Sequence, residues 1–414
     1  MTPISEVQQQ ITTLQGESNP EATDHRLRVY SDVVQLIAST DNPTPMVRVN
    51  RLNPSPGFEI YLKLERYNPF GSIKDRIALE MLRGLNRGDK TIVEPSSGNT
   101  GIALTGLANA MGIPVQIAVP SGIPEEKKLL LRLLGAELLE ADDALCPMFP
   151  SEGARGLVNA LIKSPATKDR FVSPNQYENP LNVEAHYRNT GPEIWRQTQG
   201  RVAYFFAGLG TCGTISGVGR FLKEQNPDIR IIGVEPAVVN HKLPGLKKIS
   251  NLAPEYVPKI LDRSVLDEVV EVADDTAFRT ALEMARRDGI LVGPTTGAVL
   301  AAALNYGKTR HGLAVVISPD DALKYLSFYK EFLEAETGKP AERTKEFDLS
   351  NLVCPLSKIK AVEALNDLSP GETARLLLAD RESFKNTVQE FNRLGLKQTS
   401  SRDDAGRFVL MVTR

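Results

Sequence analysis

The sequence predicts an α/β domain followed by a small α+β domain. Short apolar runs alternate with amphipathic stretches from about residue 58 to residue 330. A polar segment without periodicity, residues 337–346, interrupts this alternation, and short strands with two helices follow it. Repeated strand–helix units favour mostly parallel sheets that helices cover on both faces. We therefore predict a first domain at 1–336, a linker at 337–346 and a second domain at 347–414.

In the first domain, the strands are recognised as alternating or β-branched apolar runs and the helices as apolar residues at helical spacing. We expect strands at 58–65, 91–95, 114–120, 136–141, 201–210, 229–236 and 313–319. We expect helices at 102–112, 124–135, 213–224, 276–289 and 296–304. Ligands of such sheets bind beyond the carboxyl ends of the strands.

The second domain has its own pattern. Strands are expected at 347–349, 373–379, 397–401 and 407–413, and helices at 355–368 and near 381–394. The segment "RDDAG" is a turn signal between the last two strands. Two helices on one sheet are therefore predicted.

Composition and charge exclude several classes of protein. The formal net charge is −2, so no basic excess attracts nucleic acid or an anionic membrane. No apolar run reaches the length of a membrane span, and the first twenty residues lack a signal-peptide pattern. Three distant cysteines and four scattered histidines show no disulfide framework and no metal-ligand spacing. We expect a soluble cytoplasmic protein with free thiols and no metal.

Four segments combine glycine or hydroxyl residues with strand-to-helix junctions. In "NPFGSIKDR", Lys74 follows a Gly-Ser turn at the expected start of a helix. The other three are "SSGNTG" (96–101), "GLGTCGT" (208–214) and "GPTTG" (293–297). Each is weak by itself, because most lysines near helix starts are solvated and glycine-rich turns are common. Backbone N–H groups at such a helix start are suited to holding a phosphate.

Together and in this order, the segments resemble the cysteine synthase family. These are β-replacement enzymes that use pyridoxal phosphate in the fold-type-II (tryptophan synthase β) architecture. The resemblance runs from about residue 40, "NPTPMVRVNRL", to about residue 330, "VVISPDDALKYLS". It implies pyridoxal 5'-phosphate as cofactor and a homodimer formed through the first domain.

The resemblance also implies the roles of individual residues. Lys74 matches the lysine that forms a Schiff base with the cofactor. Asn99 matches the partner of the cofactor's ring oxygen, and Thr295 matches the hydroxyl that meets its pyridine nitrogen. The phosphate cup corresponds to Gly210, Thr211, Cys212, Gly213 and Thr214. Many relatives have glycine at the position of Cys212. We therefore interpret Cys212 as a small buried side chain rather than a reactive thiol.

The substrate carboxylate corresponds to a group made by Ser96, Ser97, Thr100 and Gln176. The implied reaction starts from a serine that carries a leaving group on Cβ. Lys74 removes the Cα proton, and the leaving group departs to give an α-aminoacrylate. A sulfur nucleophile then adds at Cβ and cysteine is released.

O-phosphoserine and O-acetylserine are both open as substrates. "FFAGLGTCGTISGVGRFLKE" and "DDALKYLS" resemble most the subgroup that takes O-phosphoserine and receives sulfur from a small carrier protein. In that subgroup, an arginine in the helix after the phosphate cup recognises the substrate phosphate, and Arg220 lies there. The alternative is that Arg220 forms a structural ion pair or is solvated.

The C-terminal segment resembles the TusA/SirA sulfur-carrier family. "FDLSNLVCP", the helix carrying Lys360, and "LSPGETARLLLADRESF" carry this resemblance. The family motif Cys-Pro-x-Pro here ends in serine, at Ser357. We expect Pro355 at the first helical position, and a helix N-terminus with Lys358 nearby that lowers the pKa of the Cys354 thiol. The apolar residues expected to face the sheet are Ile359, Val362, Leu365 and Leu368.

The fusion suggests that Cys354 delivers sulfur, either as a persulfide that attacks Cβ or by yielding free sulfide. A sulfurtransferase or a cysteine desulfurase is then the expected partner. The alternative is an inert cysteine in a docking or oligomerisation domain. Other functions left open are a serine or threonine dehydratase, another β-replacement such as diaminopropionate synthesis, and a sulfur-sensing or scaffold protein.

Overall fold

The computed structural model describes residues 29–96, 98–121, 123, 125–141, 153–239, 241–336, 344–352, 355–369, 372–396, 398–403 and 406–413. The chain forms two compact units, Met1–Leu326 and Ser327–Arg414. Their division falls at the start of helix α11 (Leu326–Glu336), before the predicted domain end at residue 336. In the part of the chain described, no helix has the length and apolarity that crossing a bilayer requires.

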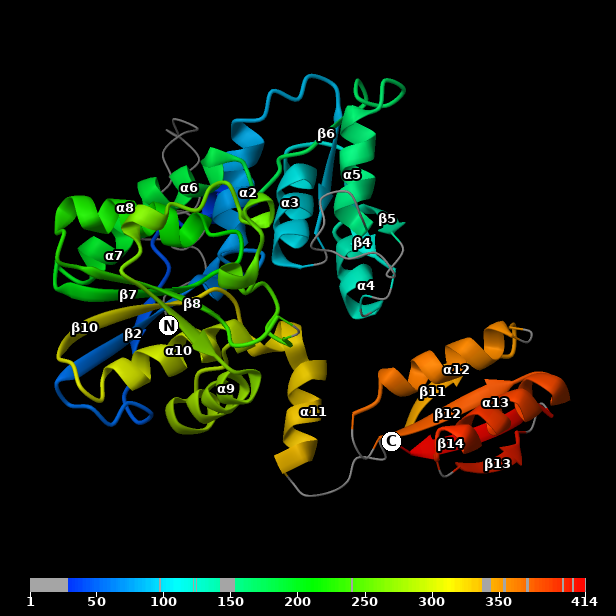
Figure 1. Cartoon of the computed structure of the whole chain (residues 1–414). Helices are drawn as coiled ribbons and strands as arrows, with labels where there is room; N and C mark the ends of the chain where they lie inside the picture. The colour runs from blue at the N-terminus through cyan, green and yellow to red at the C-terminus, as the bar shows by residue number, and fades with distance from the viewer. Residues whose placement is uncertain are drawn as a thin grey trace, which may run out of the picture. The chain divides into compact units, whose positions relative to one another are not determined.

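The first unit contains a six-stranded sheet. Its strands, in spatial order, are β1 (Met46–Arg48), β2 (Phe58–Leu64), β10 (Gly312–Ser318), β7 (Val202–Gly208), β8 (Arg230–Pro236) and β9 (Glu268–Val272). The β1–β2 pair is antiparallel, and the other neighbours are parallel. Figure 1 shows helices α7 (Gly191–Gln197) and α8 (Gly213–Gln225) on one face and α9 (Asp274–Asp288) and α10 (Pro294–Tyr306) on the other.

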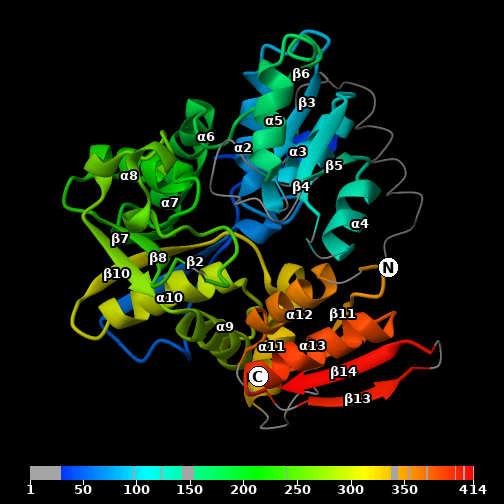
Figure 2. The same cartoon turned by 45° about the vertical axis from the view of Figure 1, so that its right-hand side comes forward.

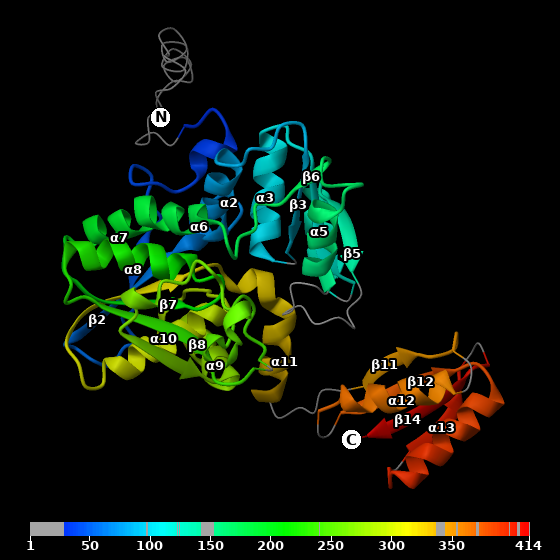
Figure 3. The same cartoon turned by 45° about the horizontal axis from the view of Figure 1, so that its top comes forward.

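A second, four-stranded parallel sheet belongs to the same unit. Its order is β5 (Glu137–Ala141), β4 (Val115–Pro120), β3 (Thr91–Pro95) and β6 (Phe171–Val172). Successive side chains point to opposite faces of a strand. Ile92 therefore packs with α3 (Asn99–Ala110), and its neighbour Val93 packs with α5 (Gly153–Lys163). Figure 3 shows the strands between these two helices.

The remaining helices of this unit are α2 (Lys74–Arg83), α4 (Glu125–Leu133) and α6 (Pro180–Ala185), with a π-helical turn at His186–Thr190 that joins α6 to α7. The predicted architecture of parallel strands covered by helices on both faces is confirmed. Helices α2, α3, α8 and α10 begin at the four glycine- or hydroxyl-rich segments. Helices α3 and α8 follow strands β3 and β7 as expected, whereas α10 follows helix α9, so its segment is not a strand-to-helix junction. The N-termini of the four helices form the walls of one cavity.

The second unit contains a four-stranded sheet. The strand order is β11 (Thr344–Asp348), β12 (Thr373–Leu378), β14 (Phe408–Thr413) and β13 (Gln398–Arg402). Helices α12 (Leu356–Asn366) and α13 (Arg381–Arg393) pack against it, as Figure 2 shows. The buried core joins Ala361 and Leu365 of α12 to Phe391 of α13 and to Leu376 and Leu410 of the sheet. The predicted α+β arrangement of two helices on a sheet is confirmed.

Three details of this unit differ from the sequence-based expectation. Strand β11 begins at Thr344, so residues 344–346 are strand and not linker. Pro355 occupies the position before the first helical residue of α12. Ile359 is 47% exposed, because Ala361 and Ala364 bring the opposite side of α12 against the sheet. Residues 337–343 and Cys354 lie outside the described residues.

Candidate active site

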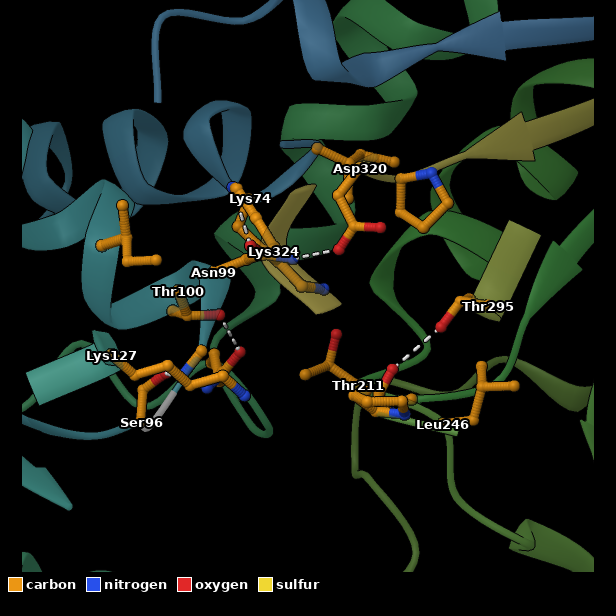
Figure 4. Close-up of a pocket in the computed structure, with 18 of the residues that line it drawn as sticks. Lys74, Ser96, Asn99, Thr100, Lys127, Thr211, Leu246, Thr295, Asp320 and Lys324 are labelled. Atoms are coloured by element: carbon orange, nitrogen blue, oxygen red, sulfur yellow. Dashed lines mark hydrogen bonds between the residues drawn. The ribbon is translucent and has the colours of Figure 1, made fainter. Parts of the chain in front are cut away.

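A cavity of about 1080 Å³ lies in the first unit and collects most of the predicted site residues. Those that line it are Lys74, Ser96, Asn99, Thr100, Gln176, Gly210, Thr211, Cys212, Thr214 and Thr295. Figure 4 shows Lys74 and Asn99 on one wall, with Thr211 and Thr295 on another. Gly213 is the first residue of α8, directly behind the wall. Ser97 lies outside the described residues.

Lys74 is the first residue of α2, where Ser72 accepts its backbone N–H at 3.2 Å through Oγ. Burial lowers the pKa of its amine to about 8. Within the described part of the chain, no side chain or carbonyl lies within hydrogen-bond distance of Lys74 Nζ. An amine that is partly neutral and unpaired near pH 8 is a suitable nucleophile for an aldehyde.

The start of α8 has the features of a phosphate site. Cys212 adopts a left-handed conformation, with φ +70°, that turns the chain into the helix. A Cβ on Gly213 would lie 1.9 Å from Asn182 Oδ1, so only glycine fits there. The first N–H groups of α8 have no partner within the helix, and the Thr211 and Thr214 hydroxyls stand beside them. Such a donor set suits a dianion.

Two buried residues behind the cup were not predicted. Asn182 Nδ2 donates to the Gln176 carbonyl at 2.8 Å and to Thr211 Oγ1 at 3.3 Å. His186 contacts Thr214 Oγ1 through Nε2 at 3.2 Å and Thr190 through Nδ1 at 3.0 Å. Burial lowers the pKa of His186 to about 3, so its imidazole is neutral. Both belong to "NPLNVEAHYRNTG", where only the Asn-Pro helix start gave a local signal.

The residues predicted to hold the substrate carboxylate lie around the N-terminus of α3. Thr100 Oγ1 donates to Gln176 Oε1 at 2.7 Å, which joins two segments 76 residues apart. Ser96 Oγ accepts the backbone N–H of Gly101 at 2.9 Å. This wall therefore combines hydroxyl, amide and helix N-terminal donors, which suit a carboxylate.

Asn99 belongs to a charged cluster that sequence reasoning missed. Its Nδ2 donates to Asp320 Oδ2 at 2.6 Å, and its Oδ1 accepts from Lys324 Nζ at 2.9 Å. Burial raises the pKa of Asp320 and lowers that of Lys324. Both follow β10 in "SPDDALK", so their position after a buried strand was the available signal. On the opposite wall, Thr295 Oγ1 donates to the Pro244 carbonyl at 2.8 Å.

Arg220 does not line the cavity. Its Nη2 donates to Glu184 Oε1 at 2.7 Å, and its guanidinium lies 3.9 Å from the centre of the Tyr187 ring. The ion pair and the cation–π contact hold the side chain away from the cavity lining, so this arrangement does not support the expected role of Arg220 as a phosphate ligand.

Cys212 has a buried thiol whose pKa burial raises to about 12. A thiol with this pKa is almost entirely protonated near neutral pH and is a poor nucleophile. This agrees with the interpretation of Cys212 as a small buried side chain.

In the second unit, Lys358 lies 4.0 Å from Glu390, so the cation expected near Cys354 also has a carboxylate partner.

Comparisons with known proteins agree with this geometry. Residues 37–320 match the family of pyridoxal-phosphate-dependent enzymes, and residues 345–414 match the sulfurtransferase TusA family. A cysteine synthase of Aquifex aeolicus is 40% identical over 311 residues, covering 72% of this chain and 92% of that protein. The chain belongs to the cysteine synthase family. The expected cofactor, pyridoxal phosphate, is confirmed by this membership.

Two solved structures are similar to the first unit as well. The cysteine synthase of Entamoeba histolytica aligns with a TM-score of 0.66 at 29% identity, covering 77% of this chain and 99% of that one. An O-ureido-L-serine synthase aligns with a TM-score of 0.66 at 30% identity, covering 76% and 98%. The residues of the cavity fit the cofactor of the family, because an unpaired amine faces a glycine-lined helix N-terminus with two threonine hydroxyls.

Proposed function

We propose that this chain makes L-cysteine from an activated serine and a sulfur donor. The observation that carries the proposal is the unpaired Lys74 amine, which shares one cavity with a phosphate-type helix N-terminus and a carboxylate-type helix N-terminus. Pyridoxal phosphate supplies the electron sink that makes the Cα proton of the amino acid acidic. The protein supplies binding, orientation and proton transfer.

Each wall has a distinct task in this reaction. Gly210 to Thr214 hold the cofactor's phosphate, and Asn99 and Thr295 orient its ring. Ser96, Ser97, Thr100 and Gln176 hold the substrate carboxylate, which presents the Cα proton to Lys74. The Lys74 amine accepts that proton and later returns it. A neutral hydroxyl at Thr295 leaves the pyridine nitrogen largely unprotonated, which favours rapid loss of the Cβ leaving group.

We further propose O-phosphoserine as the activated serine. The cavity wall carries four basic side chains, Lys74, Lys127, Arg155 and Lys324, against two acidic ones, Asp320 and Asp321. This balance supports a substrate with an anionic leaving group. O-acetylserine is the second candidate, because a similar solved structure is an O-acetylserine sulfhydrylase of Entamoeba histolytica.

The TusA-type unit supports sulfur delivery to this enzyme. A tethered carrier raises the effective concentration of sulfur near the catalytic unit. We propose that Cys354 carries a persulfide, loaded by a sulfurtransferase or a cysteine desulfurase. Attack through the outer sulfur leaves cysteine disulfide-bonded to Cys354, so a reductant or second thiol must release it. We also propose a cytoplasmic homodimer.

One assay tests these points together. Purified protein loaded with cofactor is given O-phosphoserine or O-acetylserine, each with sulfide or with a persulfide donor, and cysteine is quantified. Pyruvate and ammonia in place of cysteine would indicate a dehydratase. The variant Cys354→Ser should lose cysteine formation from the persulfide donor and keep that from sulfide. Equal rates for both proteins with the persulfide donor would refute sulfur delivery by Cys354.

A further inference from the structure

Arg155 is a cavity-lining cation that none of the tasks above uses. It lies in the first turn of α5, and its guanidinium lies 4.8 Å from the centre of the Tyr177 ring. Within the part of the chain that the structure describes, Arg155 has no carboxylate at ion-pair distance and no hydrogen-bond acceptor. A half-buried guanidinium that faces a cavity without a counterion is unusual, because such groups are normally paired.

The buried carboxylate of Glu94 lies close enough to Arg155 for their charges to interact, but its hydrogen bonds come from other groups. Glu94 accepts the Ser173 hydroxyl at 2.7 Å, the Asn175 N–H at 3.0 Å and the Gln176 N–H at 3.2 Å. Burial raises the pKa of Glu94, and the hydrogen bonds from these neutral donors and the positive charge of Arg155 oppose that rise. In the described part of the chain no hydrogen bond or ion pair joins Arg155 to Glu94, so the N–H groups of Arg155 remain available to a ligand in the cavity.

A second cation lies against the same ring. Lys247 Nζ is 4.9 Å from the centre of Tyr177, so one aromatic ring contacts two positive side chains. Stacking on a ring holds the plane of a guanidinium and leaves its N–H edge available. Two parallel N–H groups on that edge match the oxygens of a phosphate.

The position of Tyr177 in the chain places the N–H edge of Arg155 near the expected substrate. Tyr177 directly follows Gln176, which belongs to the carboxylate-binding wall. In O-phosphoserine, the carboxylate and the phosphate are only a few bonds apart. An amino acid held at Gln176 therefore carries its Cβ substituent within the same region of the cavity as Tyr177 and Arg155.

We propose that Arg155, held by Tyr177, binds the phosphate ester of the amino-acid substrate and selects O-phosphoserine over O-acetylserine. The proposal rests on the proposed function and assigns to Arg155 the task that the sequence suggested for Arg220. The two arginines form a natural contrast. Both lie over a tyrosine ring, but Arg220 is paired with Glu184 and does not line the cavity, whereas Arg155 lines it and has no carboxylate partner among the described residues.

The test compares kcat/KM for the two esters, with sulfide as the common nucleophile. In Arg155→Gln, the ratio of O-phosphoserine to O-acetylserine should fall about 10- to 100-fold, the range expected for charge-assisted hydrogen bonds. Arg155→Lys keeps the charge but loses the paired N–H edge, so its ratio should be intermediate. Arg220→Gln is the matched control and should leave the ratio unchanged. An unchanged ratio in Arg155→Gln, or an equal fall in Arg220→Gln, would overturn the proposal.

A second measurement separates this inference from the proposed substrate. Inorganic phosphate is tested as a competitive inhibitor against O-acetylserine, after loading with cofactor. Inhibition of the wild type that weakens about 10-fold or more in Arg155→Gln supports the phosphate subsite even if O-phosphoserine proves a poor substrate. The same inhibition constant in both proteins would reject Arg155 as a phosphate ligand, while leaving cysteine synthesis intact. Circular dichroism of both Arg155 variants checks that α5 still folds.

Discussion

Helix α2 carries one cation that has no ion-pair partner in the described part of the chain and, two residues later, one that is fully ion-paired. On the cavity side, Lys74 has an unpaired amine. Two residues later, Arg76 donates to Glu65 and Glu193 at 2.6 Å each, and Lys63 donates to Glu193 at 2.6 Å. These four side chains are at most 1% exposed and join β2, the turn after it, α2 and α7. The paired cluster fixes the helix, and the unpaired amine at its end is left reactive.

The pKa values of the two regions follow from this difference. Burial lowers the pKa of Lys74 to about 8, because Cys212 and Asp320 compensate only in part for the lost hydration. Burial by itself would raise the pKa of Glu65, but Arg76 outweighs it and lowers that pKa to about 2. In the paired cluster the outcome differs between residues: Arg76 outweighs burial at Glu65, whereas burial outweighs Glu193 at Lys63 and lowers the pKa of that amine.

The largest effect is expected from removing the unpaired amine. Lys74→Ala should lower cysteine formation by about 10³-fold or more, because it removes both the attachment point and the general base. Cysteine release is measured with either serine ester and sulfide. Lys308→Ala, at an exposed lysine, is the control and should have wild-type activity. Wild-type turnover by Lys74→Ala would remove Lys74 from the mechanism.

Breaking the paired cluster should act on stability. Glu193→Gln leaves Lys63 and Arg76 with an incomplete set of anions, and should lower the free energy of unfolding by about 3–5 kcal/mol. Urea denaturation of the wild type and the variant measures this loss. Asp275→Asn breaks the exposed pair with Arg279 and should change the same quantity by less than about 1 kcal/mol. Equal losses would mean that burial of the cluster is irrelevant.

The pH dependence of cofactor loading tests the lowered pKa of Lys74 separately from the paired cluster. The neutral form of Lys74 attacks the aldehyde, and its fraction falls as the pH drops below about 8. The loading rate of cofactor-free protein should therefore decrease about tenfold per pH unit below that value and level off above it. Stopped-flow absorbance of the cofactor follows the rate. A plateau that begins only near pH 10.5 would show that burial does not shift the pKa of Lys74.

His186 lies between the two regions, since it contacts Thr214 of the cup and its pKa is lowered by burial and by Arg76. His186→Leu removes the partner of the Thr214 hydroxyl and should weaken cofactor binding about 10-fold. Fluorescence titration gives the affinity, and the phosphorus NMR shift of the bound cofactor reports on the cup. Because His186 is neutral far above its pKa of about 3, affinity differences between the two proteins should not vary from pH 6 to pH 8. A variation in that range would contradict a neutral imidazole.

The smallest effect is expected at Cys212. Its left-handed backbone favours glycine by about 1 kcal/mol, while the buried side chain contributes packing of similar size. Cys212→Gly should therefore change the free energy of unfolding by less than about 1 kcal/mol and leave cofactor affinity unchanged. Denaturation and titration measure the two quantities. A large loss of activity in a stable Cys212→Gly protein would give the thiol a chemical role.

Much of the fold was predictable because strand and helix periodicities are local. Strands such as β2 and β8 and helices such as α8 and α9 were expected within a few residues of their observed bounds. The short strand β6 and the edge strand β9 were not expected, since two residues or an exposed edge carry little apolar pattern. Ile359 was expected to face the sheet but is exposed, because packing on the small Ala361 and Ala364 decided the orientation of α12.

The residues of the candidate site also fall into those that local sequence predicted and those that it did not. Lys74, Asn99 and the segment around Cys212 were found because glycine, hydroxyl groups and helix starts lie close together in sequence. The cluster of Asp320 with Lys324 and the support from His186 were not found, because each depends on partners at least 28 residues away. For Arg220, sequence position suggested a phosphate ligand, whereas the structure pairs it with Glu184 and leaves it out of the cavity lining.

By itself, the sequence determined the order of strands and helices, the helix N-termini that form the cavity and the residues that meet there. Backbone preferences act over a few residues, so these features are written in short segments. Only the tertiary structure decided which charges are paired. Arg76 and Arg220 are paired with carboxylates from distant segments, whereas Lys74 and Arg155 line the cavity without an ion-pair partner among the residues that the structure describes, because long-range packing alone places a counterion.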